Sequence, residues 1–95
     1  MITHIVLFKL KDRSPESVAN TAQVLRDMEG KIDVLRHLEV GMDVIHSDRS
    51  YDIALYTKFD SMEDLQVYQV HPVHKKVIEH MLSVREASVS VDYES

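Results

Sequence analysis

The segment from Ile2 to Leu10, ITHIVLFKL, places the strongest constraint on the fold, because it is apolar on both faces when it forms a strand. One face carries Ile2, His4, Val6, Phe8 and Leu10, and the other carries Ile5 and Leu7. A strand with two apolar faces belongs in a sheet that is covered on both sides. Something must therefore pack against each face of this sheet.

The rest of the chain predicts two helices and three further strands. Ser14 and Pro15 suit the N-cap and first position of a helix, and apolar residues at helical spacing follow as far as Gly30. A second helix is expected after Ser61, with a break before Pro72, because the residue preceding proline is disfavoured in the helical region. The resumed helix is expected to extend to about Leu82. The three strands are predicted over Leu35–Ile45, Tyr51–Phe59 and Ala87–Tyr93.

This order, β-α-β-β-α-β, predicts an α+β fold of the ferredoxin-like kind, with an antiparallel sheet and both helices on one face. The other face is left open, although it carries Ile5, Leu7, Ala54 and Tyr56. An exposed apolar face of that extent usually marks an association surface. We therefore predict a homodimer in which two sheets pack face to face.

Size and charge narrow the classes of function. The 95 residues predict one domain, residues 1–95, and the net charge of -5 argues against nucleic acid as a partner. Cysteine is absent, so disulfides, thiolate metal sites and a cysteine nucleophile are excluded. The longest apolar stretch is too short to span a bilayer, and the N-terminal segment lacks the features of a signal peptide. We expect a cytoplasmic protein without a membrane partner.

The segment YQVHPVHKKV, from Tyr68 to Val77, concentrates the candidate functional side chains. Pro72 belongs at the first position of a helix, which places His71 at the N-cap and His74 at the third helical residue. Two imidazoles that share a metal from one regular helix are four residues apart, whereas these are three apart. No nearby carboxylate completes a metal site. We therefore predict neither a metal nor a cofactor.

His74 is the first candidate for chemistry. It extends a ladder with Ile78 and Leu82 at four-residue spacing, so its ring is expected on the core side of the helix. The positive end of the helix dipole disfavours an imidazolium there, and a neutral, half-buried imidazole is suited to act as a general base. The alternative is a histidine at the edge of the core, bonded to a backbone carbonyl.

Tyr68 and His4 are the other candidate catalytic residues. The Tyr68 hydroxyl lies close enough in sequence to share a pocket with His74, and His4 lies on the strand face that the helices are expected to cover. Both histidines would then line one cavity. The alternatives are packing with an exposed hydroxyl for Tyr68 and a hydrogen bond at the sheet margin for His4.

Three stretches, HIVLFKLK, SYDIALYTKFDSMEDLQVYQVHPVH and VSVDYE, resemble the Dabb family, the stress-responsive dimeric α/β barrel domain. The resemblance covers nearly the whole chain. It implies a ferredoxin-like subunit and a dimer whose two sheets close into a barrel. In a plant branch that is similar to polyketide cyclases, the tyrosine and second histidine of the motif serve catalysis, and the early strand histidine joins them. These residues correspond to Tyr68, His74 and His4, but Ile53 replaces a further histidine, which argues against the same substrate.

Two functional hypotheses follow. In the first, a pocket near His74 binds a small carbonyl or polyketide-like molecule and supports a cofactor-free reaction of the cyclase, isomerase or lyase type. In the second, the protein is a non-catalytic stress-related or ligand-binding homodimer, and YQVHPVH is a structural start of a helix. A solvent-connected cavity at His74 would favour the first hypothesis, and a filled core would favour the second.

Overall fold

The computed structural model describes residues 1–95, and the elements follow the predicted order. The strands and helices are β1 (Ile2–Leu10), α1 (Pro15–Arg26), β2 (His37–Met42), β3 (Ile53–Phe59), α2 (Met62–Val70), α3 (Pro72–Val84) and β4 (Arg85–Glu94). The predicted α+β, ferredoxin-like class is confirmed. The expected break before Pro72 divides the second helical segment into α2 and α3, with His71 between them.

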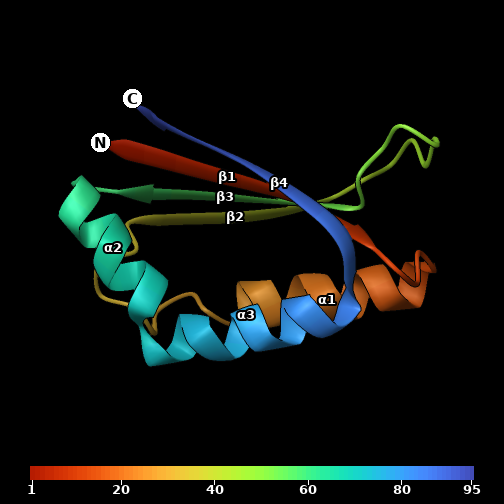
Figure 1. The fold of residues 1–95 in the computed structure, drawn as a ribbon, viewed down its shortest axis with the longest axis horizontal. Helices are drawn as coiled ribbons and strands as arrows, with labels where there is room; N and C mark the ends of the chain where they lie inside the picture. The colour runs from red at the N-terminus through yellow and green to blue at the C-terminus, as the bar shows by residue number, and fades with distance from the viewer.

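The sheet has the strand order β2-β3-β1-β4, and every neighbouring pair is antiparallel. The strand β1, which is apolar on both faces, therefore lies in the interior of the sheet, between β3 and β4. Its pairing with β4 brings Ile2 opposite Glu94 at one end and Leu10 opposite Arg85 at the other. Figure 1 shows β4 running alongside β1, with the two chain ends next to each other.

The helices α1 and α3 lie side by side across one face of the sheet, while α2 covers its end (Figure 1). The core forms between these helices and the inward-facing side chains of β1 and β3. Burial is complete at Ala22 and Leu25 of α1, at Phe59 of β3 and at Tyr68 of α2, all of which are inaccessible to solvent. The buried apolar cluster consists of Ile2, Phe8, Leu10, Val18, Ala22, Leu25, Met28, Ile32, Ile53, Leu55, Phe59, Leu65, Tyr68, Val77 and Met81.

Two strands are shorter than predicted, because polar contacts end them. The strand β2 stops at Met42, where the Asp43 carboxylate accepts a hydrogen bond of 2.6 Å from the backbone of His46. The strand β3 begins only at Ile53, because Asp52 is buried and accepts a bond of 2.8 Å from the Leu10 amide. Arg13 pairs with the same carboxylate at 3.0 Å.

The first helix also ends earlier than expected. It stops at Arg26, and the chain continues through turns to Gly30, which has φ +80°. The left-handed conformation expected at Gly30 is thus present, but it closes the turn after the helix.

The sheet face opposite the helices remains open. Leu7, Val89 and Val91 lie together on it with exposed fractions of 36%, 48% and 52%. Ile5, Ala54 and Tyr56 are half-buried beside them. The predicted apolar face is therefore present, and β4 enlarges it. None of the helices has both the length and the hydropathy needed to cross a membrane.

Candidate functional site

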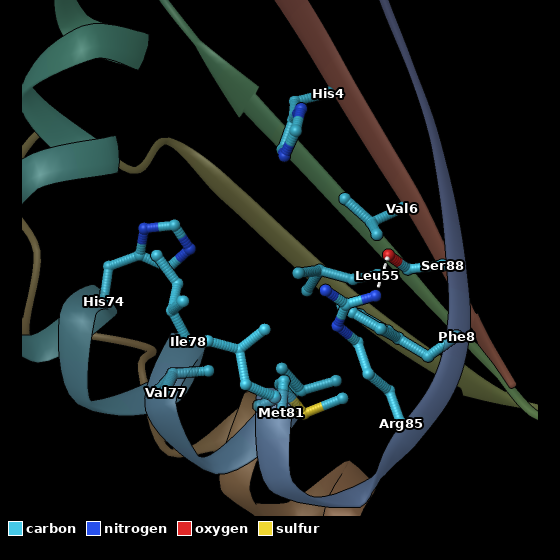
Figure 2. Close-up of a pocket in the computed structure, with 12 residues that line it drawn as sticks. His4, Val6, Phe8, Leu55, His74, Val77, Ile78, Met81, Arg85 and Ser88 are labelled. Carbon is cyan, nitrogen blue, oxygen red and sulfur yellow. Dashed lines mark hydrogen bonds between the residues drawn. The ribbon is translucent and has the colours of Figure 1, made fainter. Parts of the chain in front are cut away.

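A pocket of about 130 Å³ lies between the helix-covered face of the sheet and α3. Most of its wall is apolar, and polar side chains are concentrated at two places. Figure 2 shows His4 and His74 toward one end and Arg85 with Ser88 toward the other. The lining residues are His4, Val6, Phe8, Leu25, Leu55, His74, Val77, Ile78, Met81, Leu82, Arg85 and Ser88.

The helix α3 turns His74 toward this pocket. His74, Ile78 and Leu82 recur every four residues and all line it. The neighbouring Lys75 and Lys76 are exposed on the other side of the helix. The predicted orientation of the His74 ring is therefore confirmed.

The hydrogen bonds of His74 determine which ring nitrogen is free. Its Nδ1 lies 3.1 Å from the backbone oxygen of Tyr68. A carbonyl oxygen can only accept, so Nδ1 carries the hydrogen and Nε2 keeps a lone pair. Nε2 has no partner in the chain, yet no buried side-chain nitrogen is left unbonded. Nε2 must therefore be accessible from solvent, which is the arrangement that a general base requires.

Burial lowers the pKa of His74 below its ordinary value of 6.5, since the charged ring loses contact with water. The carbonyls of Tyr68 and Gln69 act in the opposite direction, while charge on His4 or His71 would lower the pKa further. The sequence predicted a neutral ring because of the helix dipole, whereas desolvation is the main cause here. The neutral imidazole is favoured at pH 7.

His4 is held by an acid from the neighbouring strand. Its Nδ1 bonds to Oδ1 of Asp92, which lies opposite it in the β1–β4 pairing. A carboxylate accepts, so Nδ1–H donates and the second nitrogen of His4 is left free. The His4 side chain is 12% exposed and the Asp92 side chain 41%. Asp92 thus fixes the orientation of the His4 ring at the edge of the pocket.

Tyr68 contacts both histidines through its ring rather than through its hydroxyl. The ring stacks on His74 with 3.9 Å between centroids and meets the edge of His4 at 6.3 Å. The hydroxyl points into the core, 3.9 Å from Met28 Sδ, and the residue is inaccessible to solvent. The expectation that this hydroxyl shares a pocket with His74 is therefore not met. Burial also raises the pKa of the Tyr68 phenol, so it stays protonated.

His71 has a structural contact. It is the N-cap of α3, as predicted, and its Nδ1 accepts a hydrogen bond of 3.1 Å from the Val73 amide. No group of three or more histidine, aspartate or glutamate side chains converges as a metal site would need. The absence of a bound metal stays a prediction.

Asp92 and Arg85 were missed by the sequence reasoning. The last strand alternates apolar residues with Ser88, Ser90 and Asp92, and that alternation is the signal that could have placed Asp92 on the helix side. Arg85 is the first residue of β4 and follows α3 directly, and no sequence motif marks this passage from helix to strand.

Several known proteins are similar to this chain. A Stress-response A/B barrel domain-containing protein, DABB1 of Arabidopsis thaliana, is 31% identical over 98% of the chain, which spans only 46% of that relative. A dimeric protein of unknown function with a ferredoxin-like fold, from Bacteroides fragilis, is 34% identical with a TM-score of 0.83. The match covers 99% of this chain and 95% of that one.

The fold also occurs in enzymes. The hydroxynitrile lyase from Passiflora edulis has a TM-score of 0.82 at 18% identity, over 97% of this chain and 90% of its own. At that identity the likeness is one of fold alone. Residues 2–95 match the model of the Stress responsive A/B Barrel Domain. The chain therefore belongs to the Dabb family, the stress-responsive A/B barrel domain.

Proposed function

We propose that the protein is a cofactor-free acid–base enzyme that acts on a small carbonyl compound in the pocket beside His74. The reaction would be of the cyclase, isomerase or lyase type and would begin with removal of a proton from the carbon next to the carbonyl group. The observation that carries this proposal is an apolar pocket in whose wall two imidazoles each keep an unbonded nitrogen. Apolar pockets with few, convergent polar groups are typical of small-molecule sites.

The pocket volume limits the ligand. At about 130 Å³ it is close to the ~150 Å³ of an apolar protein cavity that binds benzene. A long polyketide chain would extend beyond this volume. We therefore favour a small ketone or aldehyde over a polyketide-like substrate.

In the proposed step, Nε2 of neutral His74 removes a proton from the carbon next to the carbonyl group. The electron pair of that C–H bond forms the enolate double bond, and the carbonyl pair moves to oxygen. When the His4 ring carries a hydrogen on both nitrogens, with Nδ1–H held by Asp92, its Nε2–H can pass to that oxygen. The Tyr68 ring is a positioning residue, because it stacks on His74 and contacts His4 without reaching the pocket.

Exchange of carbon-bound hydrogen for deuterium tests this step directly. Cyclohexanone in deuterium oxide should lose its α-proton NMR signals faster with the protein than with buffer alone. His74→Gln should lower that rate to the buffer level, because glutamine cannot take the proton. His80→Gln is the matched control, since His80 is exposed on the same helix. Equal rates for wild type and His74→Gln would contradict the proposal.

A ligand-binding protein without catalysis is the second candidate. It is favoured by the contacts that tie His71 and His74 to the junction of α2 and α3, since both would stabilise a helix start in a non-catalytic protein. In that case cyclohexanone would shift the NMR signals of pocket residues in wild type without any deuterium exchange.

We also propose that two copies associate through the open sheet face. Leu7, Val89 and Val91 give that face an apolar surface that water would otherwise cover. The dimeric state of the similar structure from Bacteroides fragilis supports the same arrangement.

A further inference from the structure

Arg85 brings a positive charge into a mostly apolar pocket. It is half-buried, and Figure 2 shows its guanidinium group extending back over the pocket from the start of β4. Its only side-chain hydrogen bond is a donation of 3.1 Å from Nη1 to Ser88 Oγ. One neutral hydroxyl leaves most of the guanidinium donors free.

No acidic side chain neutralises Arg85. Two of the other four arginines have such partners, since Arg13 pairs with Asp52 and Arg36 with Asp60, each at 3.0 Å. The remaining two, Arg26 and Arg49, form no ion pair but are exposed to water, whereas Arg85 is half-buried. Arg85 forms no ion pair, and none of the lining residues of the pocket is acidic. The chain has 16 acidic residues, yet none of them pairs with this half-buried cation. Arg85 is therefore suited to bind an anion from outside the chain.

We propose that Arg85 binds the carboxylate of the ligand, so that the pocket takes a small oxo acid. The guanidinium fork matches a carboxylate in geometry and charge. The assignment of a ketone to the histidine end rests on the proposed function, whereas the carboxylate site rests on Arg85 and Ser88.

The register of the sheet sets the length of such a ligand. Ser88 lies opposite Phe8, four residues of β1 from His4, so these two backbone positions are about 13 Å apart at ~3.3 Å per residue. Side chains stand roughly perpendicular to a sheet, so we take this spacing for the Arg85–Ser88 pair and the His4 ring as well. Hydrogen bonds of about 3 Å at each end leave roughly 7 Å for the ligand. Three bonds of an extended chain span about 3.5 Å, so a ligand with roughly six bonds fits. Levulinate, in which two methylene groups separate the ketone from the carboxylate, has five bonds between the ketone oxygen and a carboxylate oxygen and is thus close to this length.

A comparison of three related ligands distinguishes the contribution to binding of the Arg85 end of the pocket from that of the histidine end. Levulinate carries both groups, methyl levulinate keeps the ketone without the charge, and valerate keeps the carboxylate without the ketone. Binding to the full chain is measured by NMR titration at fixed ionic strength. We expect methyl levulinate to bind about 10- to 100-fold more weakly than levulinate, the usual worth of a charged hydrogen bond.

Variants of Arg85 then locate the effect. Arg85→Met should weaken the binding of levulinate and of valerate by about 10- to 100-fold, and should leave the affinity for methyl levulinate unchanged. Arg85→Lys should retain part of the preference for the acid, because it keeps the charge without the fork. Arg36→Gln is the control for loss of a positive charge outside the pocket, and should change none of the three affinities.

The outcomes distinguish this inference from the proposed function. Equal affinities for levulinate and methyl levulinate in wild type would overturn the carboxylate site, whatever the cyclohexanone exchange shows. Valerate binding that depends on Arg85, without any exchange of cyclohexanone, would support the carboxylate site and contradict the enzyme. The ligand comparison in wild type needs no variant, so it stands even if Arg85→Met fails to fold.

Discussion

His74 is confined on two sides and free on a third. The Tyr68 ring stacks on one face of the imidazole, the Tyr68 carbonyl holds Nδ1, and Nε2 remains accessible from the pocket. One residue of α2 therefore fixes both the tilt and the tautomer of the ring, so that the position of its lone pair does not depend on a flexible side chain.

The lowered pKa of His74 predicts a pH dependence of stability. In the unfolded chain the ring takes up a proton near its ordinary pKa of 6.5, whereas in the folded protein it does so at a lower pH. Between the two values the unfolded state binds more protons, so the free energy of unfolding falls as the pH drops below 6.5.

Chemical denaturation across this window measures the effect. His74→Gln should show a smaller fall in unfolding free energy than wild type, since glutamine does not titrate. His80→Gln, on the exposed side of α3, should keep the wild-type slope. Identical slopes in all three proteins would mean that burial does not act on His74 as described.

The Tyr68 hydroxyl should matter much less than its ring. Tyr68→Phe removes only the 3.9 Å contact with Met28 Sδ, a weak acceptor, so we expect a change within about 1 kcal/mol. Tyr68→Ala leaves a cavity and should cost about 3–5 kcal/mol, as for other large buried aromatics. NMR titration should find the pKa of His74 unaltered by Tyr68→Phe. A large shift would show that the hydroxyl, and not the ring, acts on the histidine.

At the scale of elements, the junction between α2 and α3 depends on a side-chain cap. The His71 side chain accepts a hydrogen bond from the Val73 amide, one of the first-turn amides of α3 that have no partner within the helix. His71→Ala should lower the free energy of unfolding by about 1 kcal/mol. His71→Asn should restore much of that loss, because asparagine is a strong N-cap residue. Thermal unfolding at fixed protein concentration compares the three, and failure of asparagine to outperform alanine would argue against the cap.

The bounds of helices and strands could be predicted from the sequence where residues close by in the chain determine them. The bounds of β1 were correct because its alternation is uninterrupted, and the α2–α3 break followed from Pro72. The C-terminal end of β2 and the start of β3 were predicted wrongly because Asp43 and Asp52 act through turn and long-range contacts.

The candidate site was predictable only in part, for a similar reason. His4 and His74 could be placed on facing elements from periodicity, and they line the same pocket. The partnership of His4 with Asp92 joins residues 88 apart and depends on the register of β4. The direction of the Tyr68 hydroxyl depends on the packing of Met28, which no sequence pattern encodes.

At the scale of the whole molecule, the open sheet face predicts a dimer. Sedimentation equilibrium at low micromolar concentration should give twice the mass of one chain. Leu7→Asp should shift this equilibrium toward monomer and lower thermal stability, because the carboxylate would be buried against an apolar face.

Val67→Asp is the matched control for this test. Val67 is 47% exposed on α2, away from the open face, so the same charge there should leave the mass unchanged. A folded wild-type monomer at that concentration would contradict the dimer.

The strand β4 belongs to both surfaces at once. Its even-numbered residues Ser88 and Asp92 face the pocket side, and its odd-numbered residues Val89 and Val91 face the open side. A ligand that binds more tightly to one placement of β4 makes that placement more common, and the surface for association on the other face of β4 changes with it. Reciprocity then requires that any factor by which the ligand tightens the dimer equals the factor by which dimerisation tightens the ligand. Dilution of the protein shifts the equilibrium from dimer toward monomer. If the two are coupled, dilution should therefore change the affinity of the pocket for its ligand, without any chemical reaction.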